Sequence, residues 1–181
     1  DPMSELGAKT LPALKEERWN YVILQEYSTG PITARDQFFS SVKALCDLSR
    51  QADATPILYA TWAFKKDGVK LREAGLGYLR MYRELCEAYR EAGMQNNAPV
   101  AEVGRKFYAV SRRENLYAHD DYHPNKAGSR LAAETIAALI TKKGTEAMPL
   151  QSKRDLADAI LDRILSMRTD TETERYQPVS V

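Results

Sequence analysis

Short apolar runs alternate with helical patterns along this chain, and this alternation restricts the folds open to it. Three runs are rich in β-branched and aromatic residues and are apolar on both sides, as strands buried in a parallel sheet are: Trp19 to Glu26, Pro56 to Phe64 and Pro99 to Val103. Apolar residues at helical spacing predict helices over 34–52, 76–93, 106–113 and 125–140. Strands alternating with helices predict an α/β fold, a parallel sheet with helices on both faces.

The carboxyl ends of such strands form the edge at which α/β sheets bind ligands. Gln25 and Glu26 end the first run, Thr61 and Trp62 lie near the end of the second, and a loop at 120–123 follows the third. We therefore expect these polar and aromatic side chains to meet at one edge of the sheet.

Both histidines of the chain, His119 and His123, fall in this loop region. An imidazole is suited to proton transfer near neutral pH, and a carboxylate such as Asp120, three residues before His123, can orient its ring. Pro124 disfavours helix at His123, so this pair is expected on a loop that enters the helix over 125–140. Asp120 and His123 are the candidate catalytic pair.

Other interpretations of the loop stay open at this point. Asp121 is the orienting carboxylate if the loop register differs by one residue. His119 is expected at the surface or in the wall of a cleft. Asp120 and His123 are also compatible with an ordinary turn and helix start, which have no chemical role.

The length of 181 residues suits one main domain with a C-terminal extension. We assign residues 1–143 to the α/β domain, 144–168 to a linker and an amphipathic helix, and 169–181 to a polar, flexible tail. The two cysteines, Cys46 and Cys86, lie in helical patterns and are expected to be free thiols.

Charge and composition argue against several classes of partner. With 26 basic and 25 acidic residues spread along the chain, nothing indicates nucleic-acid binding. No apolar run approaches the roughly 20 residues that a membrane span needs. No spacing of His and Cys resembles a metal-ligand set, so we expect no metal.

Two segments together resemble the SGNH (GDSL-like) hydrolase superfamily. The segment 116–133 is similar to its terminal Asp-x-x-His block, including Pro124 and Gly128, and the segment 19–28 is similar to one of its strands. The resemblance covers roughly residues 19–140. It implies a three-layer, flavodoxin-like α/β/α sheet and a serine hydrolase that needs no cofactor.

The resemblance also implies roles for individual residues. His123 would be the general base that activates a serine hydroxyl, and Asp120 would fix its tautomer. Gln25 would donate to the developing oxyanion, an interaction worth about 3 kcal/mol, or would simply cap the strand. Glu26 is expected to be structural or to contact substrate, and Trp62 to line a substrate wall, although a core aromatic is the alternative.

The sequence departs from the family pattern at the nucleophile. Family members carry it in a Gly-Asp-Ser or Gly-Asn-Ser segment after their first strand, and these 181 residues contain none. Together with Asp1 as first residue, this suggests a chain that lacks the N-terminal strands and the nucleophile block. Ser28 is the alternative nucleophile within the chain, although Gly30 and Pro31 also favour a turn or cap serine.

Two classes of function follow. The first is an SGNH-type esterase acting on an acetylated carbohydrate or another small ester. The second is a binding or scaffolding module that keeps the fold without the nucleophile. A nucleotide-binding domain has little support, because no Gly-rich loop follows any strand. A sheet without its first strands would have an unpaired edge, so we expect a homo-oligomer or an N-terminal fragment held at the strand Trp19 to Glu26.

Overall fold

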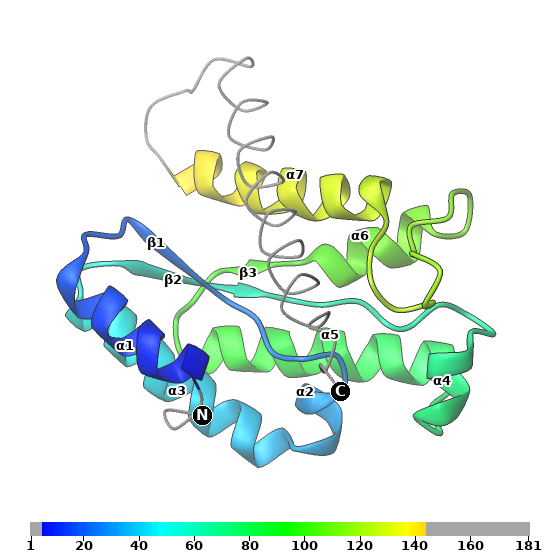
Figure 1. Ribbon diagram of the computed structural model, residues 1–181, viewed down its shortest axis with the longest axis horizontal. Helices are drawn as coiled ribbons and strands as arrows, with labels where there is room; N and C mark the ends of the chain where they lie inside the picture. Colours follow the sequence, from blue (N-terminus) through cyan, green and yellow to red (C-terminus); the bar gives the residue numbers. More distant parts are fainter. Residues whose placement is uncertain (1–4, 144–181) are drawn as a thin grey trace, which may run out of the picture.

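A computed structural model describes residues 5–143 of the chain (Figure 1). Its elements are α1 (Glu5–Glu16), β1 (Tyr21–Leu24), α2 (Gly30–Thr33), α3 (Arg35–Gln51), β2 (Thr55–Tyr59), α4 (Val69–Glu73), α5 (Tyr78–Gln95), β3 (Val100–Ala101), α6 (Val103–Val110) and α7 (Lys126–Lys143). The expected linker, C-terminal helix and tail at 144–181 lie outside the described residues.

The three strands form one parallel sheet in the order β1-β2-β3. Tyr21 lies opposite Thr55 in the first pair, and Leu58 lies opposite Val100 in the second. The sheet that alternating strands and helices predicted is therefore confirmed.

Helices cover both faces of this sheet (Figure 1). Helices α3 and α5 lie on one side of it, and α6 and α7 lie on the other. Successive residues of β2 serve the two sides in turn, since side chains alternate along a strand: Leu58 packs with α3 and α5, whereas Ile57 and Tyr59 pack with α6 and α7. The fold is the expected three-layer α/β/α arrangement of the flavodoxin type.

The strands are shorter than the apolar runs that predicted them. Strand β1 is four residues long and lies at an edge of the described sheet. It is therefore not buried on both faces as predicted, and Ile23 is 38% exposed. Regular pairing of β2 ends at Tyr59. The chain then continues through 60–65 without regular structure. This segment anchors the loop between α6 and α7 that is described below.

Gly93 does not end helix α5, contrary to the prediction from its position. The helix continues to Gln95, and the turn out of it is made at Asn97, which adopts a left-handed φ of 46°. A Cβ at Gly93 would collide with Val100 and with the Ala98 carbonyl oxygen. The glycine is therefore needed for the close approach of α5 to β3.

Helix α6 begins three residues earlier than its predicted start at Lys106, because Val103 and Phe107 are both buried against the sheet. Helices α1, α2 and α4 were not predicted from the sequence. Helices α2 and α4 span only four and five residues, too short to show a period. Both cysteines are free thiols as expected, with Cys46 buried and Cys86 half-buried.

Candidate active site

The loop between α6 and α7 is a compact turn at the carboxyl ends of the strands. The backbone N–H of Ala118 donates to the His123 carbonyl oxygen at 2.9 Å, and Tyr117 forms a short antiparallel bridge with Pro124. Asn125 caps α7, because its Oδ1 accepts from the Gly128 N–H at 3.0 Å. The turn is thus closed at its base and fixed to a helix, as Pro124 indicated.

Within this turn, the Asp120 carboxylate has three hydrogen-bond contacts, two of them with His123. Asp120 Oδ2 lies 2.6 Å from His123 Nδ1, and Asp120 Oδ1 accepts from the backbone N–H groups of His123, at 3.0 Å, and Tyr122, at 3.2 Å. The His123 side chain is 46% exposed, and its Nε2 has no hydrogen-bond partner among residues 5–143. The imidazole therefore has one nitrogen fixed and the other open to a reactant.

The electrostatic setting keeps Asp120 ionised near neutral pH. Partial burial alone would raise the pKa of this carboxyl group. The hydrogen bonds from the His123 ring and from the backbone N–H groups of His123 and Tyr122 outweigh it, so the pKa lies below its usual value. An ionised Asp120 favours the tautomer in which Nδ1 carries the proton and Nε2 is the basic nitrogen.

Asp121 occupies a different position from Asp120. Its backbone is left-handed, with φ of 64°, and its carboxylate forms an ion pair with Lys65 Nζ at 2.9 Å. That hydrogen bond lowers the pKa of Asp121. The geometry makes Asp120, and not its neighbour, the carboxylate that contacts the imidazole.

The segment after β2 anchors the turn. Trp62 Nε1 donates to the Tyr122 carbonyl oxygen at 3.0 Å. The backbone N–H of Lys65 donates to the Asp121 carbonyl oxygen at 2.9 Å. The Trp62 ring stacks on Phe107 with centroids 4.2 Å apart, and the Tyr122 ring packs on the His123 ring at 3.9 Å. Trp62 therefore positions the turn, and its N–H is not available to an oxyanion.

Lys65 was not identified by the sequence analysis. A lysine in a polar stretch carries no signal of its own, and its link to Asp121 joins residues 56 positions apart. Only the tertiary structure shows this contact.

The residues that follow β1 have no hydrogen bond to the Asp120–His123 pair within 5–143. The Gln25 side chain is exposed and forms no hydrogen bond within 5–143. Glu26 folds back so that its Oε1 accepts from the Tyr27 N–H at 2.8 Å, and its backbone N–H donates to the Tyr89 hydroxyl at 3.2 Å. Ser28 lies in the turn before α2, and no hydrogen bond joins it to His123.

The Glu26 side chain can turn back over the chain because residue 30 is a glycine. A Cβ at Gly30 would come within 2.7 Å of the Glu26 Cγ. Glu26 is therefore in a structural position at this turn.

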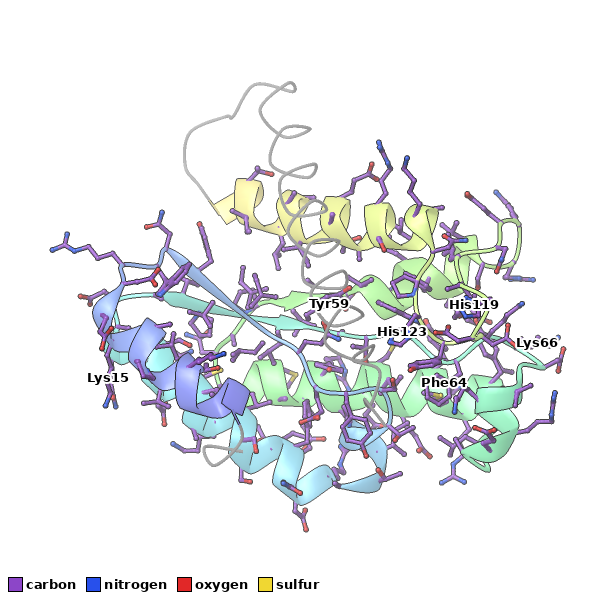
Figure 2. The ribbon with its side chains drawn as sticks, viewed as in Figure 1. Lys15, Tyr59, Phe64, Lys66, His119 and His123 are labelled. Carbon is purple, nitrogen blue, oxygen red and sulfur yellow. The ribbon has the colours of Figure 1, made fainter. Side chains whose placement is uncertain are left out.

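Other predicted side chains lie around the turn (Figure 2). His119 is on the same loop as His123, and its side chain is exposed. Tyr117 is largely buried, with its hydroxyl donating to the Ala63 carbonyl oxygen at 2.9 Å, so its side chain joins the loop to the segment after β2. Residues 5–143 contain no cluster of three His, Cys, Asp or Glu side chains suited to a metal ion.

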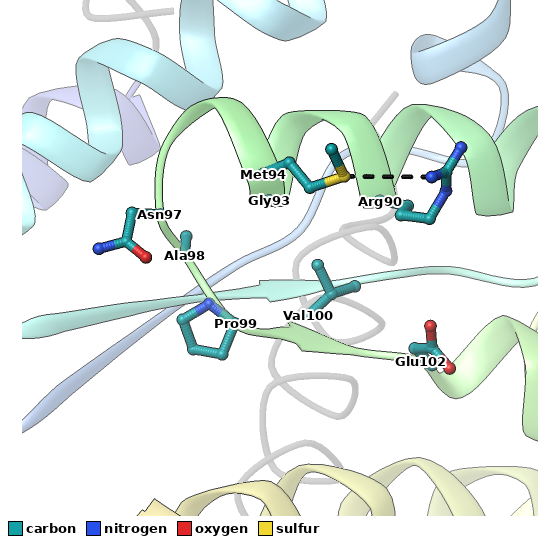
Figure 3. Close-up of a pocket in the computed structure, with 8 residues that line it drawn as sticks. All are labelled: Arg90, Gly93, Met94, Asn97, Ala98, Pro99, Val100 and Glu102. Carbon is teal, nitrogen blue, oxygen red and sulfur yellow. Dashed lines mark hydrogen bonds between the residues drawn. The ribbon is translucent and has the colours of Figure 1, made fainter.

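A separate cavity of about 360 Å³ lies between the end of α5 and the start of β3 (Figure 3). Arg90, Met94 and Glu102 are among its lining residues, and neither Asp120 nor His123 is. No helix within 5–143 is both long and apolar enough to cross a bilayer.

These features define an α/β protein with an Asp–His pair on a rigid turn at the carboxyl edge of a parallel sheet. No family model and no curated protein matches the chain. Among solved structures, it is similar to a candidate SGNH hydrolase from Slackia heliotrinireducens, with 37% identity, a TM-score of 0.73, and coverage of 77% of this chain and 76% of that one.

A second structure, a DUF4886 family protein from Bacteroides uniformis ATCC 8492, is 17% identical, with a TM-score of 0.57 over 86% of this chain and 66% of that one. This likeness concerns the fold alone. The similarity to the Slackia protein shows the family: the chain belongs to the SGNH hydrolases.

Proposed function

We propose that this protein hydrolyses a small ester by acyl transfer to a serine hydroxyl and then to water. The observation that carries the proposal is the Asp120–His123 pair, with Oδ2 and Nδ1 2.6 Å apart and Nε2 open. A base held in one tautomer with a free second nitrogen is the arrangement that serine activation needs. An acetylated carbohydrate is one substrate that suits this chemistry.

In the proposed first step, a serine Oγ attacks the ester carbonyl carbon and forms a C–O bond. Its proton passes to His123 Nε2, and the bond to the leaving alkoxide breaks as that proton is delivered to it. Water then attacks the acyl-serine with the same base and releases the acid and the serine. Gln25, exposed at the end of β1, is the proposed side-chain donor to the oxyanion.

We further propose that the serine is supplied by a segment paired with the open edge of β1, rather than by Ser28. Thr55 N–H donates to the Asn20 carbonyl oxygen at 2.9 Å, so by the alternation of parallel pairing the peptide groups of Tyr21 and Ile23 face away from β2. No described strand pairs with them. A strand added there would end at the same edge as the Asp120–His123 turn.

The native protein labelled with a fluorophosphonate probe tests the source of the hydroxyl. We expect labelling at a serine outside residues 1–181, found by mass spectrometry of the labelled peptide, and no labelling of the His123→Ala variant. Labelling at Ser28 would make Ser28 the nucleophile, in place of a serine on a segment paired with β1. If neither is labelled, the protein is a binding module that keeps the SGNH fold.

The open edge also predicts association. An unpaired, partly apolar strand edge tends to recruit another strand. We expect light scattering of the native protein to show a dimer, or a complex with a bound fragment, and Ile23→Lys to weaken the association. Leu79→Lys, an exposed leucine on α5, is the matched control and should leave it intact. A monomer of 20.4 kDa without a bound fragment would contradict this expectation.

A further inference from the structure

A second hollow, which we call the basic cleft, adjoins the Asp120–His123 turn. Its volume is about 660 Å³, within the range of small-molecule sites. It lies between the segment after β2 and the segment after α6. Its charged lining residues are Lys65, Lys66, Asp67, Arg112, Arg113 and Glu114.

Two lining residues of the cleft contact the chain neighbours of Asp120 and His123. Lys65 lines it and pairs with Asp121, the residue after Asp120. Tyr117 lines it and bridges Pro124, the residue after His123. In Figure 2, Lys66 lies at the same end of the molecule as His119 and His123.

The charges of the cleft are incompletely compensated. Lys65 is neutralised by Asp121, but Lys66, Arg112 and Arg113 have no ion-pair or hydrogen-bond partner for their side chains within residues 5–143. Two carboxylates, Asp67 and Glu114, also line it, which leaves one excess positive charge. Two consecutive unpaired guanidinium groups suit recognition of a carboxylate or phosphate, which Arg can bind with two parallel hydrogen bonds.

Neutral polar groups complete the lining. The Tyr78 hydroxyl and Ser111 Oγ lie 3.3 Å apart and form a hydroxyl pair at the wall. The Tyr78 ring stacks on Tyr108 with centroids 6.1 Å apart, so its position is fixed. Hydroxyl groups beside cations suit a ligand that is polar as well as charged.

We propose that the basic cleft binds an anionic group on the substrate, so that the ester hydrolysed at His123 is an acidic one. This inference rests on the proposed esterase function. The anionic group is a carboxylate, as on a uronic acid, or a phosphate, since either matches the guanidinium groups of Arg112 and Arg113. Bound there, it would orient the ester toward the Asp120–His123 turn.

Direct binding tests the cleft without using activity. We expect glucuronate or glucose 6-phosphate, titrated into the native protein by calorimetry, to bind with an affinity that falls as salt rises, while glucose does not bind. The double variant R112Q/R113Q should weaken binding by at least about tenfold. The matched control R18Q/R83Q removes two exposed arginines elsewhere and should have no effect.

The preferred ligand distinguishes the two sources of negative charge. Tighter binding of glucuronate assigns the cleft to carboxylates, and tighter binding of the sugar phosphate assigns it to phosphates. Equal binding of glucose, or an affinity that R112Q/R113Q leaves unchanged, would overturn the proposal.

Kinetics separate this inference from the proposed function. For hydrolysis of a carboxylated aryl acetate, R112Q/R113Q should raise KM with kcat nearly unchanged, whereas the neutral aryl acetate should be unaffected. An increase in KM of equal size for both esters would contradict an anion subsite. If neither ester is hydrolysed but glucuronate binds through Arg112 and Arg113, the esterase function fails while the anion site remains.

Discussion

Replacement of His123 by Ala is expected to reduce ester hydrolysis by about 10⁴-fold or more in kcat. The reason is local: the His123 imidazole is the base that Asp120 orients through Nδ1 while Nε2 stays open, and Asp120 is already committed to Nδ1 and to two backbone N–H groups. The measurement is the hydrolysis of 4-nitrophenyl acetate by the native protein and by the variant, with the fold checked by circular dichroism. Activity within tenfold of the native value would remove His123 from the mechanism.

The two adjacent carboxylates provide a matched pair for the same experiment. Asp120→Asn should lose a comparable factor, because an amide cannot favour the tautomer that leaves Nε2 basic. Asp121→Asn should stay within a few-fold, since it breaks only a partly exposed ion pair with Lys65 and asparagine accepts the left-handed backbone. The opposite result would make Asp121 the orienting residue.

Replacement of Gly104 by Ala is expected to produce the largest loss of stability among conservative changes near the site. Gly104 lies in the first turn of α6, and its N–H donates to the Ala60 carbonyl oxygen at 3.0 Å. A Cβ there would overlap the Thr61 carbonyl oxygen and approach Trp62 Cα. Because backbone cannot yield as a side chain can, α6 or the segment 60–65 must move, at a cost of about 1–3 kcal/mol.

The measurement for Gly104→Ala is thermal unfolding, in which we expect a decrease in Tm of several degrees. Gly77→Ala is the matched control: Gly77 precedes α5, and nothing lies within 4 Å of a Cβ built on it. Its effect should stay within about 0.5 kcal/mol. A Tm for Gly104→Ala equal to that of Gly77→Ala would show that α6 can shift without cost.

The fold could be predicted from the sequence because its signals are local. The continuous apolar run around Ile57, Leu58 and Tyr59 reflects burial on both faces of the sheet, and the helical spacing in α3 and α5 reflects the helix faces that pack on it. The limits of the elements were less accurate, because they depend on tertiary packing. Gly93 is the clearest case: the predicted helix ended at this glycine, but α5 continues to Gln95 and the glycine serves the approach of α5 to β3.

The candidate site could be predicted only where its members are close in sequence. Asp120 and His123 are three residues apart, and a hydrogen bond between them follows from the turn itself. The contacts of Trp62 and Lys65 with this turn join residues 60 and 56 positions apart, and no periodicity encodes them. The hydrogen bond from the Trp62 indole N–H to the Tyr122 carbonyl oxygen could therefore not be predicted, and substrate contact by Trp62 stays a prediction.

The hydrogen bonds that anchor the turn also allow its opening to be measured by amide hydrogen exchange. The amide protons of Ala118 and Lys65 are bound to the carbonyl oxygens of His123 and Asp121. Each of these protons can exchange with deuterated solvent only when the turn separates from its base or from the segment after β2. Their exchange rates therefore report how often the turn that carries His123 opens, with no need for a substrate or for a chemical step.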